Sequence, residues 1–368
     1  MYTYKPTDAD HIHVYGRTVM QEPLPLFWTA SGVEFSTDST EAWIEMECDY
    51  SFKEIWVRVE IDGFMFQRFM PEKGRKNYCL FRGFAPGQLK TIALIMEAQP
   101  MEDDETRKLL IHNIACDCLV QPVDDKDFRI EVIGDSITSG EGLTGTQDIT
   151  EWFTGIFGLN GHYGRSVAKH FDADYSIISQ SGWGVYSGWD NNIKNVIPRI
   201  YSKVCGVAIG ADNEALGAAK EHDFSAWQPD YILINLATND GGATGIDAWT
   251  DPETGIEYKQ SVDENGRLLP DSEDRFVKAT VAFLQDVRKY NPNARIIWIY
   301  GMIGYIMQDA ILKAIDEFKK LSGDDNIEYL SLPESKPEQY GSHGHPGFLD
   351  HQAAAKTIIK RLEELRNV

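Results

Sequence analysis

Residues 128–140 read FRIEVIGDSITSG, and this stretch decides the fold that the rest of the chain has to complete. Its first half, from Phe128 to Ile133, is an apolar run with the length of a buried strand. Its second half is a turn between two glycines that carries Ser136. A serine in such a turn, just past a buried strand, can stand clear of the sheet and meet a substrate.

Further strand-like runs follow, and they alternate with segments of helical periodicity. The expected strands are 128–133, 175–179, 231–236, 296–300 and 327–332, and the expected helices are 274–290, 308–321 and 352–365. Strands joined by crossover helices predict an α/β fold with a doubly wound, parallel, five-stranded sheet. Active sites of such sheets lie at the carboxyl ends of the strands, where Ser136 is expected.

The N-terminal third has a different pattern. Between residues 10 and 120, short strands alternate with turns, most clearly at 42–47 and at 55–61, where Asp62-Gly63 signals a hairpin. This pattern is typical of an all-β sandwich. A polar, proline-containing linker at 122–127 separates the two patterns, so we expect a β-sandwich domain over 1–124 and an α/β domain over 125–368.

Composition narrows the possible partners. The net charge of −22 argues against nucleic acid and anionic membranes and suits a neutral ligand such as carbohydrate. No apolar stretch approaches the ~20 residues of a membrane span. The first residues lack a signal-peptide pattern, so a cytoplasmic location is expected unless a signal has been removed. The five cysteines are expected to be reduced thiols.

Three more motifs follow the serine turn in a fixed order. They are Ser181-Gly182-Trp183-Gly184, then Thr238-Asn239-Asp240, and finally His345-Pro346. The first two also come directly after strand-like runs. Together with Ser136 they supply a nucleophile, two kinds of oxyanion donor and a base, the set of groups that acyl transfer needs.

These four blocks resemble those of the SGNH (GDSL-like) hydrolases, over about residues 126–368. With a β module in front of them, the chain resembles carbohydrate esterase family two, whose module is jelly-roll-like; weaker matches include Gly16-Arg17, Phe27-Trp28, Ser31-Gly32, Asp62-Gly63 and Glu97. The resemblance implies a serine esterase that removes O-acetyl groups from plant polysaccharides such as xylan and mannan, with an acetylated oligo- or polysaccharide as its partner and no cofactor. It leaves the oligomeric state open.

The resemblance also implies a role for each block. Ser136 is the expected nucleophile, the alternative being a helix N-cap. The oxyanion hole is expected from the Ser136 N–H, the Gly182 N–H and the Asn239 amide, with Gly184 as the competitor of Gly182. His345 is the expected base, because proline follows it directly, whereas His343 is the alternative.

Two positions depart from the family pattern. Ala237 stands where the third block usually has glycine, and we expect it only to shift a turn. Ser342 stands three residues before His345, where most members have aspartate, and a hydroxyl cannot balance the charge of an imidazole. The resemblance includes members with a Ser–His dyad, so a backbone carbonyl near residues 341–343 is expected to accept from His345 Nδ1.

Two further expectations concern ligands. Trp183 and Trp249 are the preferred residues for stacking on sugar rings, although core packing explains either one. No metal site is expected, and a site built from His343, His345 and His351 is the alternative we consider. Two other functions stay open: a short-chain lipase or thioesterase of the same fold, and a carbohydrate-binding protein without activity.

Overall fold

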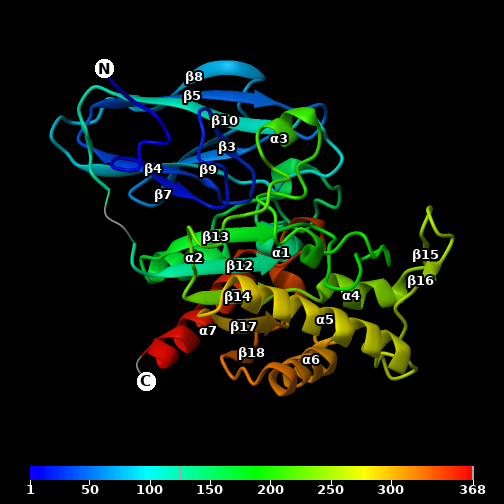
Figure 1. The fold of residues 1–368 in the computed structure, drawn as a ribbon. Coiled ribbons are helices and arrows are strands. Elements are labelled where there is room, and N and C mark those ends of the chain that lie inside the picture. The colour runs from blue at the N-terminus through cyan, green and yellow to red at the C-terminus, as the bar shows by residue number, and fades with distance from the viewer. Residues whose placement is uncertain (124–125, 367–368) are drawn as a thin grey trace. The chain divides into compact units, whose positions relative to one another are not determined.

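Alternating apolar residues in the N-terminal third build two antiparallel sheets in the computed structural model, which describes residues 1–123 and 126–366. The first sheet has the order β1 (Tyr2–Tyr4), β10 (Lys108–Cys116), β5 (Glu41–Asp49) and β8 (Gly74–Arg82), and β3 (Leu24–Leu26) also pairs with β10. The second has the order β11 (Val120–Gln121), β4 (Gly32–Thr37), β9 (Lys90–Met96), β6 (Val57–Ile61) and β7 (Phe64–Phe69), and β2 (His13–Tyr15) pairs with β4. Both sheets are visible in Figure 1.

The two sheets share one apolar core. Along β5, every second residue is buried, as the period of a strand requires when one face is covered. The buried cluster takes Ile44, Met46, Leu80 and Ile111 from the first sheet and Val33, Phe35, Val59 and Leu94 from the second. The predicted hairpin after β6 is present, and Asp62 and Gly63 both have positive φ, at 50° and 76°.

The chain divides into two units, each of which is described by itself. The β unit comprises Met1–Asp127, Glu151–Asn160 and Ser202–His222, and the α/β unit comprises Phe128–Thr150, Gly161–Tyr201 and Asp223–Val368. The predicted domain boundary between residues 124 and 125 lies outside the described residues. Segments 151–160 and 202–222, which the sequence analysis placed in the α/β domain, group with the β unit.

Specific hydrogen bonds attach these two segments to the β unit. The indole N–H of Trp28, a fully buried residue, donates to the carbonyl of Val204 at 2.7 Å. Arg68 Nη2 donates to the carbonyls of Gly155 and Phe157, at 3.1 and 3.0 Å. A buried indole such as that of Trp28 has to find an acceptor, and for both side chains the acceptors come from distant parts of the sequence.

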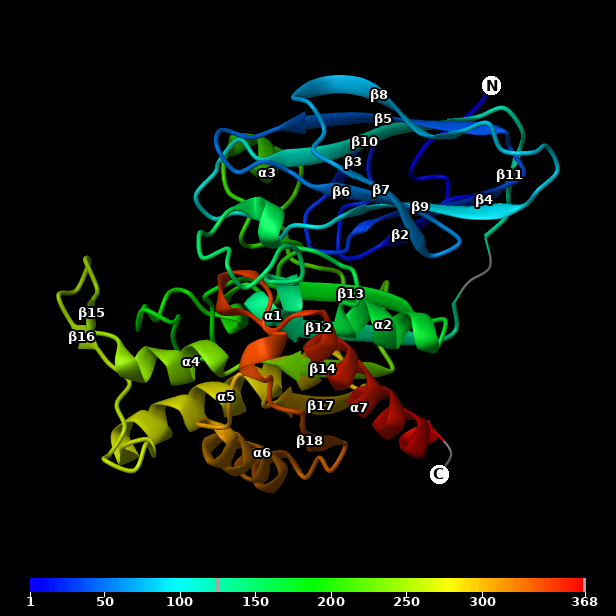
Figure 2. The same ribbon diagram turned by 180° about the vertical axis from the view of Figure 1, so that it is seen from behind.

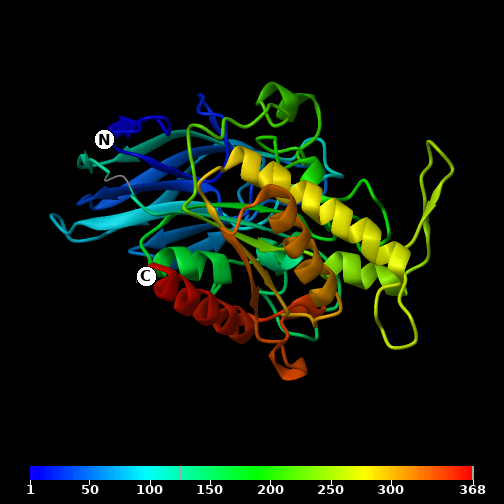
Figure 3. The same cartoon turned by 60° about the horizontal axis from the view of Figure 1, so that its bottom comes forward.

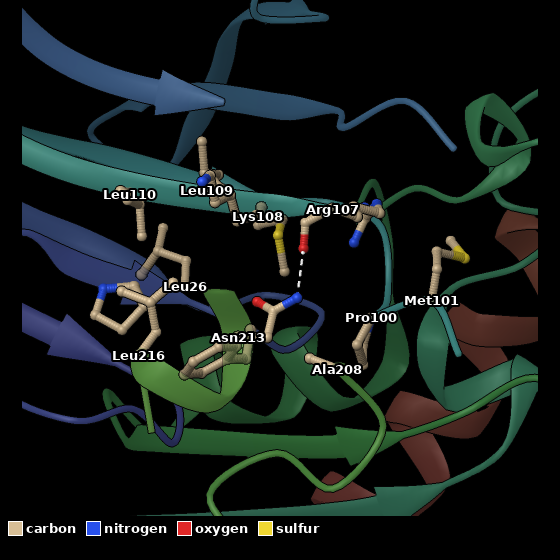
Figure 4. Close-up of a pocket in the computed structure, with 13 residues that line it drawn as sticks. Leu26, Pro100, Met101, Arg107, Lys108, Leu109, Leu110, Ala208, Asn213 and Leu216 are labelled. Carbon is tan, nitrogen blue, oxygen red and sulfur yellow. Dashed lines mark hydrogen bonds between the residues drawn. The ribbon is translucent and has the colours of Figure 1, made fainter. Parts of the chain in front are cut away.

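The second segment also closes a small cavity inside the β unit. Helix α3 (Ala211–Ala215) lies beside β3 and β10, and Asn213 Nδ2 donates to the carbonyl of Arg107 at 3.1 Å (Figure 4). The cavity between them has a volume of about 10 Å³. That is the space of about one water molecule, so this place is a packed contact and not a ligand pocket.

The α/β unit is built on a parallel sheet of five strands. Their order is β13 (Asp174–Ser179), β12 (Arg129–Gly134), β14 (Tyr231–Asn235), β17 (Arg295–Tyr300) and β18 (Ile327–Ser331). All five were predicted within one residue of these bounds. Apolar runs without alternation are expected of strands that are covered on both faces.

Helices cover both faces of this sheet. Helices α2 (Tyr163–His170) and α7 (Phe348–Arg366) pack together on one face, and α5 (Pro270–Tyr290) and α6 (Gln308–Ser322) pack together on the other (Figures 2 and 3). Helix α5 begins four residues earlier than predicted. Pro270 lies in its first turn, and its N-cap residue, Leu269, has no side chain that could form a capping hydrogen bond. Among residues 1–123 and 126–366, no helix has the length and apolar character that crossing a bilayer requires.

Candidate active site

The three motifs that follow strands meet at the carboxyl edge of the parallel sheet. Strand β12 lies between β13 and β14, and Gly134 is in register with Ser179 on one side and Asn235 on the other. The turns that leave these three strands are therefore neighbours. They carry Ser136, the run 181–184 and Asn239, as the sequence predicted for a sheet of this kind.

Ser136 begins the short helix α1 (Ser136–Ser139), directly after β12. The N-cap of this helix is Asp135, whose carboxylate accepts from the N–H of Ile137 at 3.1 Å, so the hydroxyl of Ser136 has no capping role. Burial raises the pKa of Asp135 to about 7. A Cβ at Gly134 would lie 1.9 Å from Thr138 Oγ1, so only glycine lets the strand turn this tightly.

His345 is hydrogen-bonded at both ring nitrogens. Its Nε2 lies 2.8 Å from Ser136 Oγ, and its Nδ1 lies 2.8 Å from the carbonyl oxygen of His343. A carbonyl can only accept, so Nδ1 carries the proton and Nε2 of the neutral ring is left to accept from the hydroxyl. An imidazole held in this tautomer can take a proton from Ser136.

The side chains that could have completed a catalytic triad form hydrogen bonds with groups other than His345. Ser342 is buried and donates to the carbonyl of Thr144 at 2.8 Å. Asp350 accepts from the N–H of Gly347 at 3.0 Å, within the turn before α7. The carboxylate oxygen found near His345 Nδ1 is Glu141 Oε1, at 3.7 Å, which is beyond hydrogen-bond distance.

Glu141 is a site residue that the sequence reasoning missed. Its side chain is 2% exposed, and its Oε1 lies 2.7 Å from Nδ1 of His343. Burial by itself would raise the pKa of the carboxyl, but the bond with His343, the charge of His345 and the bond from Ser181 lower it. The same bond raises the pKa of His343. His343, the alternative base, thus faces Glu141 and not Ser136.

The two glycines of the second motif have different surroundings. The Gly184 N–H donates to the carbonyl of Asn195 at 3.2 Å, so it is not available to an oxyanion. Gly182 has a φ of 78°, and within the described ranges no protein acceptor is found for its N–H. Asn239 Nδ2 donates to the carbonyl of Trp183 at 2.9 Å, which leaves its second amide hydrogen for another acceptor. This arrangement favours Gly182 over Gly184.

Asp240, in the third motif, forms hydrogen bonds with the backbone that directly follows the second motif. Its buried carboxylate accepts from the N–H groups of Val185, Tyr186 and Ser187, at 2.9, 2.7 and 3.0 Å. Burial raises its pKa to about 6. Gly184 lets this carboxylate approach, because a Cβ there would lie 2.3 Å from Asp240 Oδ2 and 2.2 Å from the Ser187 carbonyl.

Gly184→Ala is therefore expected to lower the free energy of unfolding by about 3 kcal/mol, the upper range for overpacking a buried site, and to reduce activity with it. Gly245→Ala is the matched control, since nothing lies within 4 Å of a Cβ at that position. Urea titrations of both variants check the prediction. Equal stability of the two would show that the 184–187 turn moves aside without cost.

Ala237, which stands where the family pattern has glycine, has a strained backbone conformation. Its φ is 97°, in the left-handed region, and its side chain is fully buried. Glycine adopts this conformation without the Cβ penalty, whereas alanine tolerates it at a cost of about 1–2 kcal/mol. Ala237 is the N-cap of α4 (Thr238–Gly242), so the strained residue lies in the turn that leads from β14 into this helix.

The predicted stacking residues are not equally suited to that role. Trp183 is only 5% exposed, so its ring faces are used in packing, and we do not retain it for sugar binding. Trp249 lies in the hairpin of β15 (Trp249–Thr250) and β16 (Glu257–Tyr258), with its ring 6.0 Å from that of Tyr258. Trp189, which the sequence analysis did not prefer, is 54% exposed, and its ring lies against Gly182.

Glu141, His343 and His345 also form a set that could hold a metal ion, since one ligand atom of each lies within 4.8 Å of the others. Zinc takes such ligands. Each of these side chains already has hydrogen-bond partners, however. His345 Nδ1 donates to the His343 carbonyl and its Nε2 lies against Ser136 Oγ, and His343 Nδ1 is bonded to Glu141. His351 is apart from this set: it is buried, burial lowers its pKa, and its Nδ1 accepts from the Tyr163 N–H.

Comparison with known proteins shows the class of enzyme to which the chain belongs. No family model matches the chain. It is 38% identical to an acetyl xylan esterase from the rumen bacterium Butyrivibrio proteoclasticus, with a TM-score of 0.97 over 100% of this chain and 98% of that one. A family two carbohydrate esterase from Clostridium thermocellum, solved with cellohexaose, shares the fold with a TM-score of 0.78 at 19% identity, over 97% and 99% of the chains.

Curated relatives agree with these structures. The acetylxylan esterase/glucomannan deacetylase of Cellvibrio japonicus is 22% identical over 96% of this chain and 89% of its own length. The cellulase/esterase of Acetivibrio thermocellus is also 22% identical, and the chain spans 37% of its length. The fold and these likenesses define a carboxylic ester hydrolase. The chain belongs to carbohydrate esterase family two, as its four sequence blocks and the β module in front of them had together predicted.

Proposed function

We propose that this enzyme removes O-acetyl groups from plant polysaccharides or their oligosaccharides, with acetylated xylan or glucomannan as substrate. The observation that carries the proposal is the chain of hydrogen bonds from Ser136 Oγ through His345 to the carbonyl of His343. The names of similar proteins support the substrate class, and the net charge of −22 suits a neutral glycan better than nucleic acid or an anionic membrane. We also infer an SGNH-type, doubly wound arrangement for the parallel sheet and a jelly-roll arrangement for the β unit.

The proposed reaction is a two-step acyl transfer. His345 Nε2 takes the proton of Ser136 as Oγ attacks the acetyl carbonyl carbon. The oxyanion is stabilised by the Ser136 N–H, which lies at the orphan first position of α1, by the Gly182 N–H and by the Asn239 amide. The sugar oxygen leaves with the proton from His345. Water, deprotonated by His345 in its turn, then hydrolyses the acetyl-serine and releases acetate.

The enzyme is expected to prefer acetyl over octanoyl esters. The side chains that form hydrogen bonds around Ser136, His345 and Gly182 are those of Glu141, Ser181, Asn239 and His343, and the ring of Trp189 lies against Gly182 beside them. An octanoyl chain gains about 0.8 kcal/mol per buried methylene only where apolar side chains receive it. Acetate release from acetylated xylan and glucomannan, measured beside hydrolysis of 4-nitrophenyl acetate and octanoate, checks this.

The same assay separates the other functions. Faster hydrolysis of octanoate than of acetate would favour a lipase or thioesterase. Binding of glycans without any acetate release would favour a carbohydrate-binding protein without activity. Release from one polysaccharide and not the other would name the natural main chain.

A further inference from the structure

Glu141 contacts three of the four parts of the candidate site, those of Ser136, of 181–184 and of His345, although no sequence block includes it. It follows α1 and the left-handed cap residue Gly140, and its N–H donates to the carbonyl of Ser136 at 3.0 Å. Its Oε2 accepts from Ser181 Oγ at 2.6 Å, and its Oε1 pairs with His343 Nδ1 at 2.7 Å. The carboxylate thus joins the 181–184 turn to the loop of the base, while the backbone of the same residue is bonded to the serine turn.

We propose that Glu141 is a positioning residue that holds the base His345 and the oxyanion turn at Gly182 in register with Ser136, and that supplies from a distance the negative charge that Ser342 cannot supply. The inference rests on the function proposed above. Glu141 does not bond directly to the base, because its Oε1 lies 3.7 Å from His345 Nδ1, beyond hydrogen-bond distance.

His343 transmits the effect to the base. Its backbone has a φ of 54°, a conformation that a residue with a side chain keeps only when its surroundings hold it there. Two contacts do so: its N–H donates to the carbonyl of Ile149 at 2.7 Å, and its ring is bonded to Glu141. Its own carbonyl is the acceptor for His345 Nδ1. Fixing the His343 ring therefore fixes the atom that sets the tautomer and tilt of His345.

The charge of Glu141 has a second effect. When His345 takes the proton of Ser136, its ring becomes positive, and Glu141 Oε1 lies 3.7 Å from its Nδ1. The carboxylate is 2% exposed, so water screens this attraction little. The lowered pKa of Glu141 agrees with a carboxylate that stays ionised while the reaction proceeds.

Glu141→Gln is expected to lower kcat for 4-nitrophenyl acetate by about 10²-fold with little change in KM. This is less than the ~10⁴ lost where a directly bonded acid is removed, because the Glu141 carboxylate does not bond to His345. Glu141→Asp keeps the charge on a shorter stem and is expected to recover part of the loss. Glu131→Gln is the matched control, since Glu131 is also 2% exposed and accepts from a hydroxyl, that of Tyr201 at 2.6 Å.

A pair of variants at position 343 tests the route through that side chain. His343→Asn keeps a donor for Glu141 and tolerates positive φ, so it is expected to stay within about fivefold of wild-type kcat. His343→Leu removes the donor, leaves the Glu141 carboxylate short of a partner, and is expected to lose about 10²-fold. If Leu and Asn at this position have the same kcat, the positioning role is wrong.

Labelling of Ser136 by a phosphonate ester, followed by intact mass, keeps this inference apart from the function on which it rests. No label on wild-type Ser136 would contradict the proposed function itself. A label on the wild type, with Glu141→Gln reacting as fast as Glu131→Gln, would overturn the role of Glu141 alone. Slower labelling of Glu141→Gln and His343→Leu, with the others near wild type, is the expected result.

Discussion

Replacing Ser136 by alanine is expected to abolish ester hydrolysis, lowering kcat for acetyl esters by about 10⁴-fold or more, because removing the nucleophile of a serine hydrolase typically costs 10⁴–10⁶. The fold should survive the change. The N-cap of α1 is Asp135, and Ser136 Oγ bonds only to a side chain, His345, among the contacts described for it. The measurement is acetate release together with a thermal melt.

A neighbouring serine provides the control. Ser139, in the same short helix, is fully buried and donates to Ser179 Oγ at 2.9 Å. Ser139→Ala should cost about 1 kcal/mol of stability for one buried hydrogen bond and leave turnover near wild type. Normal turnover in Ser136→Ala, with an unchanged melting curve, would rule out an acetyl-serine intermediate at this position.

His345→Ala is expected to be nearly as inactive, with kcat lower by about 10⁴-fold, because no other described imidazole lies against Ser136 Oγ. His343 is stacked on the ring of His345, with ring centres 5.5 Å apart, but it faces Glu141 and cannot replace the base. Steady-state kinetics of the purified variant, with circular dichroism to establish folding, measure the effect.

Ser342→Ala distinguishes a dyad from a triad. The Ser342 hydroxyl bonds to Thr144 and not to His345, so the variant should lose about 1–2 kcal/mol of stability and less than about fivefold in kcat. A loss near 10³-fold in Ser342→Ala would mean that the hydroxyl acts on the imidazole.

For the His345→Ala variant, a kcat equal to that of the wild type would show that a different group deprotonates Ser136.

Much of the site could be predicted because it depends on short, local patterns. The run 128–140 encodes a strand, a tight turn and a helix start within thirteen positions, and the structure has all three. The blocks at 181–184 and 238–240 follow strands in the same way. Since parallel strands present their carboxyl ends at one edge, knowing the strands was enough to bring Ser136, Gly182 and Asn239 to the same edge.

The sequence failed where a residue's surroundings, and not its neighbours in the chain, decide its role. Trp183 is of a residue type that stacks on sugar rings, but the fold buries its side chain. The side chain of Trp189 is exposed instead. The sequence preferred Gly182 to Gly184 as oxyanion donor, but the physical reason lies in the tertiary structure, where the Asn195 carbonyl accepts from the Gly184 N–H.

The sequence by itself thus determined the five strands of the parallel sheet, helices α5, α6 and α7, the order of the four blocks and the family, because each depends on spacings of a few residues; helix α2 was not predicted. The tertiary structure alone decided the role of Glu141, whose partners Ser181 and His343 lie 40 and 202 positions away. It also decided that 151–160 and 202–222 join the β unit. A buried carboxylate or indole takes whichever partner the packed chain brings within 3 Å, and no periodicity in the sequence encodes that meeting.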